Sequence, residues 1–107
     1  MFLTLNVIAY QDRPPESPLA MTFDEQGGGI GRAAVSDNRL HLPDPNKYIS
    51  RKHGRISFDK GAFFFTDTST GGTFCSTQNR SVHHDTIRLE DGDRLRIGDY
   101  ELQISLA

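Results

Sequence analysis

Residues 49–55 place a hydroxyl group, three cationic side chains and a histidine within one short stretch. The polar members of this stretch are Ser50, Arg51, Lys52, His53 and Arg55. Segments with strand-like composition and turn signals lie on both sides, so the stretch is expected to form a loop that presents hydrogen-bond donors. The ligand that suits such a loop is an anion with several oxygen atoms.

Two further stretches contain glycine together with donors and would complete such a site. Upstream, residues 27–32 combine four glycines with Arg32, and downstream residues 69–73 read Ser-Thr-Gly-Gly-Thr. Glycine lets the backbone approach a ligand closely or adopt a positive φ angle. Backbone amides in such turns can form a concave anion site. We therefore expect the three stretches to meet at one end of the domain.

The elements that must position these loops are short β-strands. Apolar alternation and turn signals predict strands over residues 2–10, 19–24, 29–32, 38–42, 54–58, 63–68, 73–76, 86–89, 94–97 and 100–106. Residues 26–29 are expected to form a flexible turn, Lys47 and Tyr48 one helical turn, and residues 77–85 a polar loop. Many short strands without helical periodicity predict an all-β sandwich or barrel.

Length and composition favour one ordinary globular domain. The chain has 107 residues, of which 36% are hydrophobic and 24% charged. No apolar run approaches the roughly 20 residues of a membrane helix, and no signal peptide is recognisable, so we expect a cytoplasmic protein. Because the last strand ends at the last residues, we expect residues 1–107 to be one domain from the N-terminal part of a longer protein.

Charge and cysteine content narrow the possible functions. The formal net charge is −2 at pH 7, which argues against sequence-independent nucleic-acid binding because that needs a basic face. Cys75 is the only cysteine, so an internal disulfide and a cysteine zinc site are excluded. We expect Cys75 to be a small strand residue.

The order of the motifs resembles that of forkhead-associated (FHA) domains over nearly the whole chain. The matching motifs are Gly31-Arg32, then Ser50-Arg51-Lys52-His53, then residues 69–73, and finally residues 89–98 with the Asp91-Gly92-Asp93 turn. Residues 42–53, 67–70 and 91–100 further resemble the N-terminal FHA domains of bacterial type VI secretion proteins. The resemblance implies an FHA-like β-sandwich of about eleven strands that binds phosphothreonine peptides through loops at one end.

The resemblance also assigns roles to individual residues. A phosphothreonine carries about −1.5 to −2 charge at pH 7 and three acceptor oxygens, and an arginine fork suits two such oxygens. The implied phosphate-binding residues are Arg32, Ser50, Arg51 and Thr70. The implied peptide-binding or loop-supporting residues are Gly31, Lys52, His53, Gly71 and Gly72. Among these, His53 is expected to hold the loops together by hydrogen bonds without touching the ligand.

Position 71 departs from the family pattern. FHA domains usually have an asparagine there, whose amide binds the peptide backbone beside the phosphothreonine, whereas this chain has Gly71. Each lost hydrogen bond would cost about 1 kcal/mol, so peptide affinity would fall several-fold to tenfold or more. We also expect a more flexible loop. The departure motivates an alternative function, which is phosphate-independent protein–protein interaction or oligomerisation.

Other interpretations of these residues receive less support. Taken singly, the arginines could be solvated surface groups and Thr70 a turn hydroxyl that satisfies local backbone. Ser50 and His53 could form a nucleophile and its base, but no nucleophile elbow or third partner is visible, so we expect no enzyme. Residues 27–31 lack the following helix and Lys-Ser/Thr pair of a nucleotide-binding loop.

A metal site is the last alternative. His83, His84 and Asp85 could supply ligands, but adjacent histidines in a strand point to opposite faces. We therefore expect solvated loop residues at these positions, with no metal and no cofactor. The expected partner is a threonine-phosphorylated protein, either a secretion-system component or a copy of this chain, and not a nucleic acid or a membrane.

Overall fold

The protein is described by a computed structural model of residues 1–107, and it is all-β. Its eleven strands are β1 (Leu3–Tyr10), β2 (Ala20–Phe23), β3 (Gly28–Gly31), β4 (Asn38–His41), β5 (Gly54–Asp59), β6 (Ala62–Asp67), β7 (Thr73–Cys75), β8 (Arg80–Val82), β9 (Thr86–Arg88), β10 (Arg94–Ile97) and β11 (Tyr100–Leu106). No helix is present that could cross a membrane. The predicted all-β sandwich of about eleven strands is confirmed.

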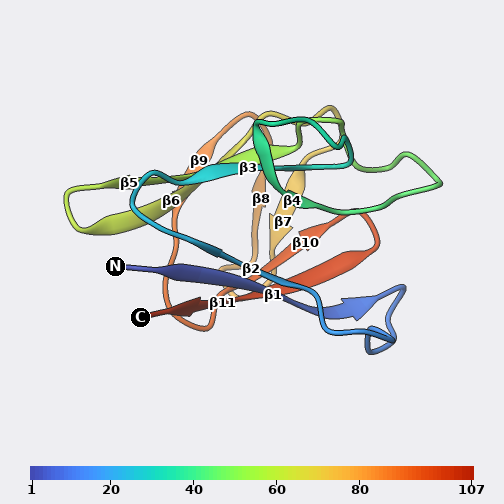
Figure 1. The fold of residues 1–107 in the computed structure, drawn as a ribbon, viewed down its shortest axis with the longest axis horizontal. Coiled ribbons are helices and arrows are strands. Elements are labelled where there is room, and N and C mark those ends of the chain that lie inside the picture. The colour runs from blue at the N-terminus through green and yellow to red at the C-terminus, as the bar shows by residue number, and fades with distance from the viewer.

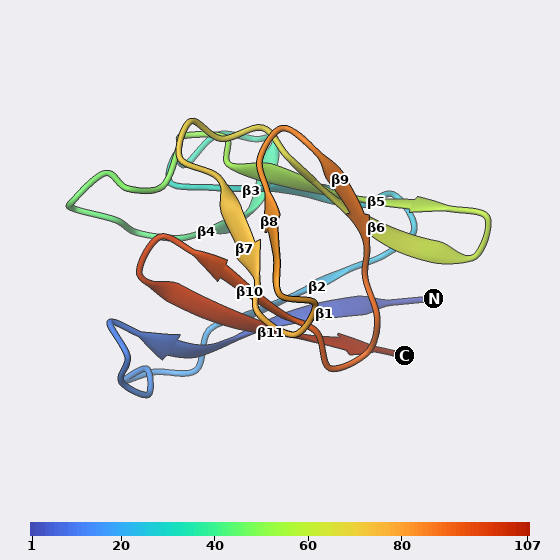
Figure 2. The same cartoon turned by 180° about the vertical axis from the view of Figure 1, so that it is seen from behind.

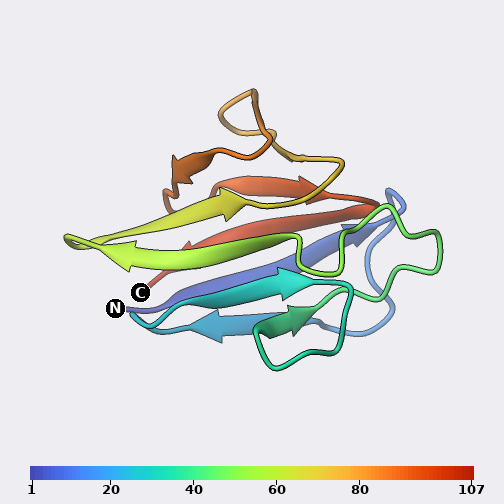
Figure 3. The same ribbon diagram turned by 90° about the horizontal axis from the view of Figure 1, so that it is seen from above.

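The strands form two sheets that pack face to face (Figures 1 and 2). One sheet has six strands in the order β2-β1-β11-β10-β7-β8, and the other has five in the order β4-β3-β5-β6-β9. Neighbouring strands are antiparallel except for β3 and β4, which run parallel. Seen from above, most strands follow the long axis of the molecule (Figure 3), so their connecting loops gather at its two ends.

The two ends of the sandwich differ in what they carry. Both termini emerge at one end, where Phe2 and Ala107 exchange backbone hydrogen bonds of 2.8 and 2.9 Å. The opposite end carries the connection from β1 to β2 and the long connection from β4 to β5 (Figure 1). The connection that contains Ser50, Arg51 and His53 therefore lies away from the chain termini, whereas Gly27, in the turn from β2 to β3, lies at the end that carries them.

The core lies between the sheets and follows the expected two-residue alternation. In β1, Leu3 and Leu5 are fully buried, and their neighbours across the ladder, Leu106 and Ile104, come from β11. In the facing sheet, Ile56 is paired with Phe65, and both are fully buried. Alternating side chains fill the space between the layers because successive residues of a strand point to opposite faces.

The ten expected strands are all present, and their observed ends lie within one residue of the predicted ends. Cys75 is confirmed as a buried strand residue in β7. β8 was missed, because it has three residues and only Val82 is apolar, and the expected polar loop over 77–85 is wrong over residues 80–82. β8 exists because it pairs with β7, placing Val82 opposite Thr73.

Two local expectations are corrected. The flexible turn over 26–29 ends earlier than expected, because Gly28 and Gly29 are buried and already belong to β3, opposite Ile56 and Arg55 of β5. The helical turn near Lys47 and Tyr48 is absent. Lys47 instead has a φ of 60°, a left-handed conformation that ends a single hydrogen-bonded turn and cannot continue a right-handed helix.

Candidate phosphate-binding site

A broad hollow of about 600 Å³ opens at the end of the sandwich that lies opposite the chain termini. Its lining residues are Arg32, Lys47, Tyr48, Ile49, Ser50, Arg51, Thr70 and Gly71. They come from three connections, which follow β3, precede β5 and follow β6. The structure thus brings the four predicted phosphate-binding residues to one place, although they are far apart in the sequence. We call this hollow the loop hollow.

Arg32 is positioned by the loop that precedes β5. Its Nε donates a hydrogen bond to the carbonyl of Ile49 at 3.0 Å, and its backbone amide donates to the carbonyl of Ser50 at 3.1 Å. These contacts use one of the five guanidinium N–H groups and leave the other four for a ligand. Neither Arg32 nor Arg51 forms an ion pair within the chain, so both charges remain available to an anion.

Asp44 holds the loop that delivers Ile49 to Arg32. The side chain of Asp44 is buried, and its Oδ2 accepts the backbone amide of Ile49 at 2.7 Å. Its carbonyl accepts the amide of Lys47 at 3.1 Å. Lys47 and Tyr48 consequently lie on the rim of the loop hollow, and sequence analysis assigned neither of them to the site. The sequence signal that could have identified Lys47 is its position three residues before Ser50.

Gly31 is required by a close approach of two backbones. A Cβ atom at this position would lie 2.1 Å from the carbonyl oxygen of Arg51. The same oxygen accepts a hydrogen bond of 2.8 Å from Nδ2 of the buried Asn38, which also donates to the carbonyl of Ala33. Glycine is therefore needed at position 31 so that the two backbones can approach closely. It is not needed for a positive φ angle, because the φ of Gly31 is not positive.

His53 joins two of the three loops. Its Nδ1 accepts the backbone amide of Ser50 at 3.2 Å, so in the neutral ring Nε2 carries the proton. Nε2 then donates to the carbonyl of Gly72 at 3.0 Å, with Thr73 Oγ1 3.1 Å away. Only 1% of His53 is exposed, and this burial lowers its pKa, although the Gly72 carbonyl and the charge of Asp67 oppose the shift.

Asp67, the last residue of β6, anchors the loop over residues 69–73 that follows this strand. Its carboxylate accepts the hydroxyls of Ser69 and Thr73 at 2.7 and 2.9 Å and the amides of Ser69 and His84 at 3.2 and 2.9 Å. Burial alone would raise the pKa of Asp67, but these four hydrogen bonds outweigh it and hold the pKa below its ordinary value. The carboxylate is therefore ionised at neutral pH and fixes the start of the loop.

The glycine-containing loop is tied down despite its composition. The amide of Gly72 donates to Ser69 Oγ at 2.7 Å, and the amide of Thr70 donates to Ser50 Oγ at 3.0 Å. The Ser50 hydroxyl proton stays free for another acceptor, as does the side chain of Thr70. Around Gly71, the nearest atom to an added Cβ would be the Tyr48 carbonyl oxygen, 3.8 Å away, so the hollow has room for a side chain there.

Lys52 does not line the loop hollow. Its Nζ pairs with Asp37 at 2.9 Å, and both side chains are more than half exposed, so the pair contributes little to stability. Its carbonyl accepts the Thr68 hydroxyl at 3.1 Å, which links the loops before β5 and after β6. The structure places Lys52 beside the hollow, where its backbone supports the loop.

His83 and His84 are exposed residues of the connection from β8 to β9, as expected, but the expectation that their side chains diverge is wrong. Both follow β8, and their ring centroids lie 4.4 Å apart because His84 adopts a left-handed φ of 53°. They group with Asp67, with ligand atoms within 4.8 Å of one another, whereas Asp85 pairs with Arg80 at 2.6 Å. Each Asp67 oxygen already accepts two hydrogen bonds, so this group serves the loop.

His84 is a loop-supporting residue that sequence analysis missed. Its Nε2 lies 2.8 Å from the carbonyl oxygen of Ser69, and its backbone amide donates to Asp67. The side chain therefore holds the start of the 69–72 loop at Ser69, whereas His53 holds its end at Gly72. No sequence signal distinguishes this histidine from its neighbour, because the left-handed backbone that aims it arises in the fold.

Known proteins match this sequence and this fold. The family model described as FHA domain matches residues 29–98, and no curated protein matches the sequence. A structure from a study of phosphothreonine-dependent FHA domain interactions is 26% identical, covers 100% of this chain and 98% of the other, and has a TM-score of 0.77.

Two further structures have a similar fold. The FhaA FHA domain, solved in complex with the intracellular domain of Rv3910, is 29% identical, with 95% and 98% of the two chains covered and a TM-score of 0.75. An FHA domain of an Arabidopsis thaliana protein is 24% identical, with 99% and 86% covered and a TM-score of 0.79. Since the family model spans well over half of the sequence, the chain belongs to the FHA domain family.

Proposed function

We propose that this domain binds a phosphothreonine-containing segment of a partner protein in the loop hollow, without catalysing a reaction. The observation that carries the proposal is the convergence of Arg32, Ser50, Arg51 and Thr70 on that hollow. FHA domains are binding modules, and one structure 26% identical to this chain comes from a study of phosphothreonine-dependent FHA domain interactions. The chemistry of the hollow supports the same ligand class.

Each group has a distinct task toward a phosphate dianion. The free N–H groups of Arg32 suit two oxygens at once, since its Nε is already bound to Ile49. The hydroxyl of Ser50 donates to a further oxygen while its lone pair accepts the Thr70 amide. Arg51 and Lys47 add positive charge at the rim. Because the hollow is open to solvent, its affinity for phosphopeptide should weaken as salt is raised.

Gly71 favours a second candidate function, which is phosphate-independent association with a partner or with another copy of the chain. With no side chain at position 71, the domain lacks the amide that reads peptide backbone elsewhere in the family. Under this alternative, a complex would form that neither phosphatase treatment nor Arg32→Ala disturbs. The two functions therefore differ in one measurable property, the dependence of binding on phosphate.

The partner is proposed from the sequence alone. Residues 42–53, 67–70 and 91–100 resemble type VI secretion FHA domains, so we propose a threonine-phosphorylated component of that bacterial system, or a second copy of this protein, as the ligand. We place the encounter in the cytoplasm. Pull-down from such a bacterium with and without phosphatase, followed by mass spectrometry, would identify the ligand.

The decisive experiment compares phosphorylated and unphosphorylated peptides. The probe is a fluorescent peptide library with phosphothreonine at a fixed position and four randomised residues on each side. A second, matched library carries unphosphorylated threonine at the same position. We expect binding of the first library only. Arg32→Ala should weaken it by about 100-fold, since a charge-assisted bidentate contact is lost. Arg32→Lys should recover only part, because lysine keeps the charge and lacks the fork.

The matched control is Arg88→Ala in β9. Arg88 is an arginine with 65% of its side chain exposed and lies outside the loop hollow, so its replacement should leave binding unchanged. Equal binding of the two libraries, or an Arg32→Ala variant that binds as well as the wild type, would refute the proposed function.

A further inference from the structure

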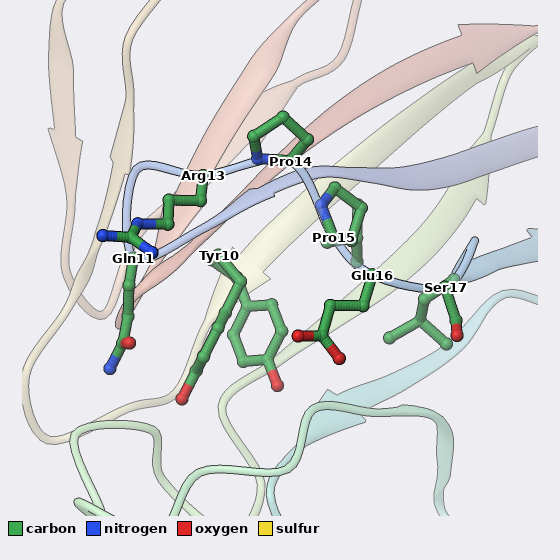
Figure 4. A pocket seen from close by; sticks show the side chains of 10 residues that line it. Tyr10, Gln11, Arg13, Pro14, Pro15, Glu16 and Ser17 are labelled. Atoms are coloured by element: carbon green, nitrogen blue, oxygen red, sulfur yellow. The ribbon is translucent and has the colours of Figure 1, made fainter.

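A second hollow lies at the same end of the sandwich, beneath the proline-containing connection from β1 to β2. It has a volume of about 490 Å³, and its walls include Tyr10, Pro14, Pro15, Leu19 and Tyr100. The rings of the two tyrosines meet at a tilt, with centroids 4.6 Å apart. Figure 4 shows the proline-containing loop passing over this region. We call this hollow the tyrosine cleft.

The walls of the tyrosine cleft are built in advance of any ligand. Tyr10 and Arg13 exchange backbone hydrogen bonds of 2.8 and 3.1 Å, which close the loop into a tight turn with Gln11 and Asp12 at positive φ. The buried Tyr100 donates its hydroxyl to a backbone carbonyl, and burial raises the pKa of that hydroxyl, so it keeps its proton. These contacts fix one side of the cleft, which reduces the entropy lost when a ligand binds there.

The rim of the cleft carries charges without internal partners. Asp12 is paired with Arg96 at 2.7 Å, but the exposed Arg13 and Glu16 form no ion pair within the chain. In Figure 4 the Glu16 carboxylate points toward the region of Tyr10, whereas the Arg13 guanidinium lies beside Gln11. An apolar floor with a rim of both charges fits a peptide segment, whose side chains are apolar and whose backbone is polar.

A single turn separates the tyrosine cleft from the loop hollow. The amide of Gln11 in the cleft donates to the carbonyl of Asp99 at 2.9 Å. The neighbouring Gly98 lies so close to Ile49 that an added Cβ would be 2.7 Å from its Cγ1. Ile49 and Tyr48 line the loop hollow. The two hollows therefore lie on either side of the β10–β11 turn, as neighbours on the surface.

We propose that the tyrosine cleft is a second subsite for the same phosphorylated partner, and that it takes an extended apolar segment of that partner containing aliphatic or proline side chains. Aromatic and proline walls of this kind suit such side chains, which pack on ring faces. The inference rests on the proposed function. It also offers a physical reason why Gly71 is tolerated. A contact in the tyrosine cleft can replace the hydrogen bonds to the peptide backbone that an asparagine at position 71 would make.

The size of the domain limits how far this segment lies from the phosphothreonine. Across its long axis the molecule measures 28 × 24 Å, and both hollows lie at one end of that axis. An extended chain rises about 3.3 Å per residue, so roughly eight or nine residues cross the wider dimension. The apolar segment should therefore begin within about nine residues of the phosphothreonine, on one side only.

The test compares short and long phosphopeptide libraries on the full chain. Both carry fixed phosphothreonine, with four randomised residues on each side in one library and ten in the other, and bound peptides are sequenced by mass spectrometry. We expect the long library to show aliphatic or proline enrichment beyond position four on one side. The tightest long peptide should bind about tenfold more weakly after Glu16→Arg or Pro14→Asp, which corresponds to one apolar side chain left in water.

Controls separate this inference from the proposed function. Glu25→Arg makes the same charge change at an exposed position in the β2–β3 turn, at the opposite end of the sandwich, and should bind the long peptide normally. Both cleft positions are exposed as well, so folding should survive, which melting by circular dichroism checks.

The outcomes are distinct. If short phosphopeptides bind but the long library shows no remote preference, or the cleft variants bind long peptides as tightly as the wild type, the inference fails and the proposed function stands. Long peptides that bind equally without phosphate would make the cleft an independent site and overturn the shared ligand. If neither library binds, the proposed function and this inference fall together.

Discussion

Replacing His53 by alanine tests whether the loop hollow is held by the network beneath it. The variant leaves the Ser50 amide and the Gly72 carbonyl without their partner. Two partly buried hydrogen bonds at about 1 kcal/mol each, and a cavity term of at least about 1 kcal/mol for a side chain that is 1% exposed, give a loss of about 3 kcal/mol or more. That is a large share of the ~5–15 kcal/mol stability of a small domain.

The same residue should make stability depend on pH. Burial lowers the pKa of His53 in the folded state, so below about pH 6.5 the unfolded chain binds a proton at this site that the folded chain does not. This contribution to the free energy of unfolding is complete above the unfolded pKa and is lost as the pH falls, by at most about 1.4 kcal/mol per pH unit.

The assay is urea denaturation followed by circular dichroism at pH 7.5 and in steps down to pH 5. We expect a lower midpoint for His53→Ala at pH 7.5 and a flatter decline with acid than in the wild type. Phosphopeptide affinity should also fall, although His53 does not line the hollow. A loss of stability below about 1 kcal/mol, or a wild type that becomes more stable on acidification to pH 5.5, would refute the network described here.

Three further predictions concern neighbouring residues. Gly31→Ala should destabilise the fold by about 2 kcal/mol or more, because its Cβ would meet the Arg51 carbonyl at 2.1 Å, and urea midpoints unchanged from the wild type would contradict this. Gly71→Asn should fold normally, since the nearest atom to its Cβ lies 3.8 Å away, and should tighten phosphopeptide binding several-fold in fluorescence anisotropy; weaker binding would count against the proposed peptide path. Asp67→Asn should lower the thermal midpoint at pH 7, because an ionised acceptor of four hydrogen bonds is lost, and the deficit should shrink as the pH falls below about 4 and the wild-type carboxylate gains its proton. A deficit that grows with acid would show that the Asp67 pKa is not lowered.

Most of the fold could be predicted because its signals are local. The alternation in β1 and β11 and the turns at Gly61 and Gly92 are visible within a few residues, so strand ends could be predicted to within one residue. β8 could not, because three mostly polar residues carry no alternation and become a strand only by pairing with β7. Lys47 was missed for another reason: its left-handed turn is held by two local hydrogen bonds to Asp44, which residue type alone does not reveal.

The sequence by itself determined the chemistry of the loop hollow: which donors it has, that they sit in loops, and that position 71 has no side chain. Only the tertiary structure decided that His53 is a buried neutral bridge, that His84 clamps Ser69, and that the tyrosine cleft lies beside the hollow. The physical reason is that residue type fixes what a side chain can donate or accept. Burial, hydrogen-bond geometry and backbone direction depend on contacts between segments far apart in the chain, and these exist only once the two sheets have packed.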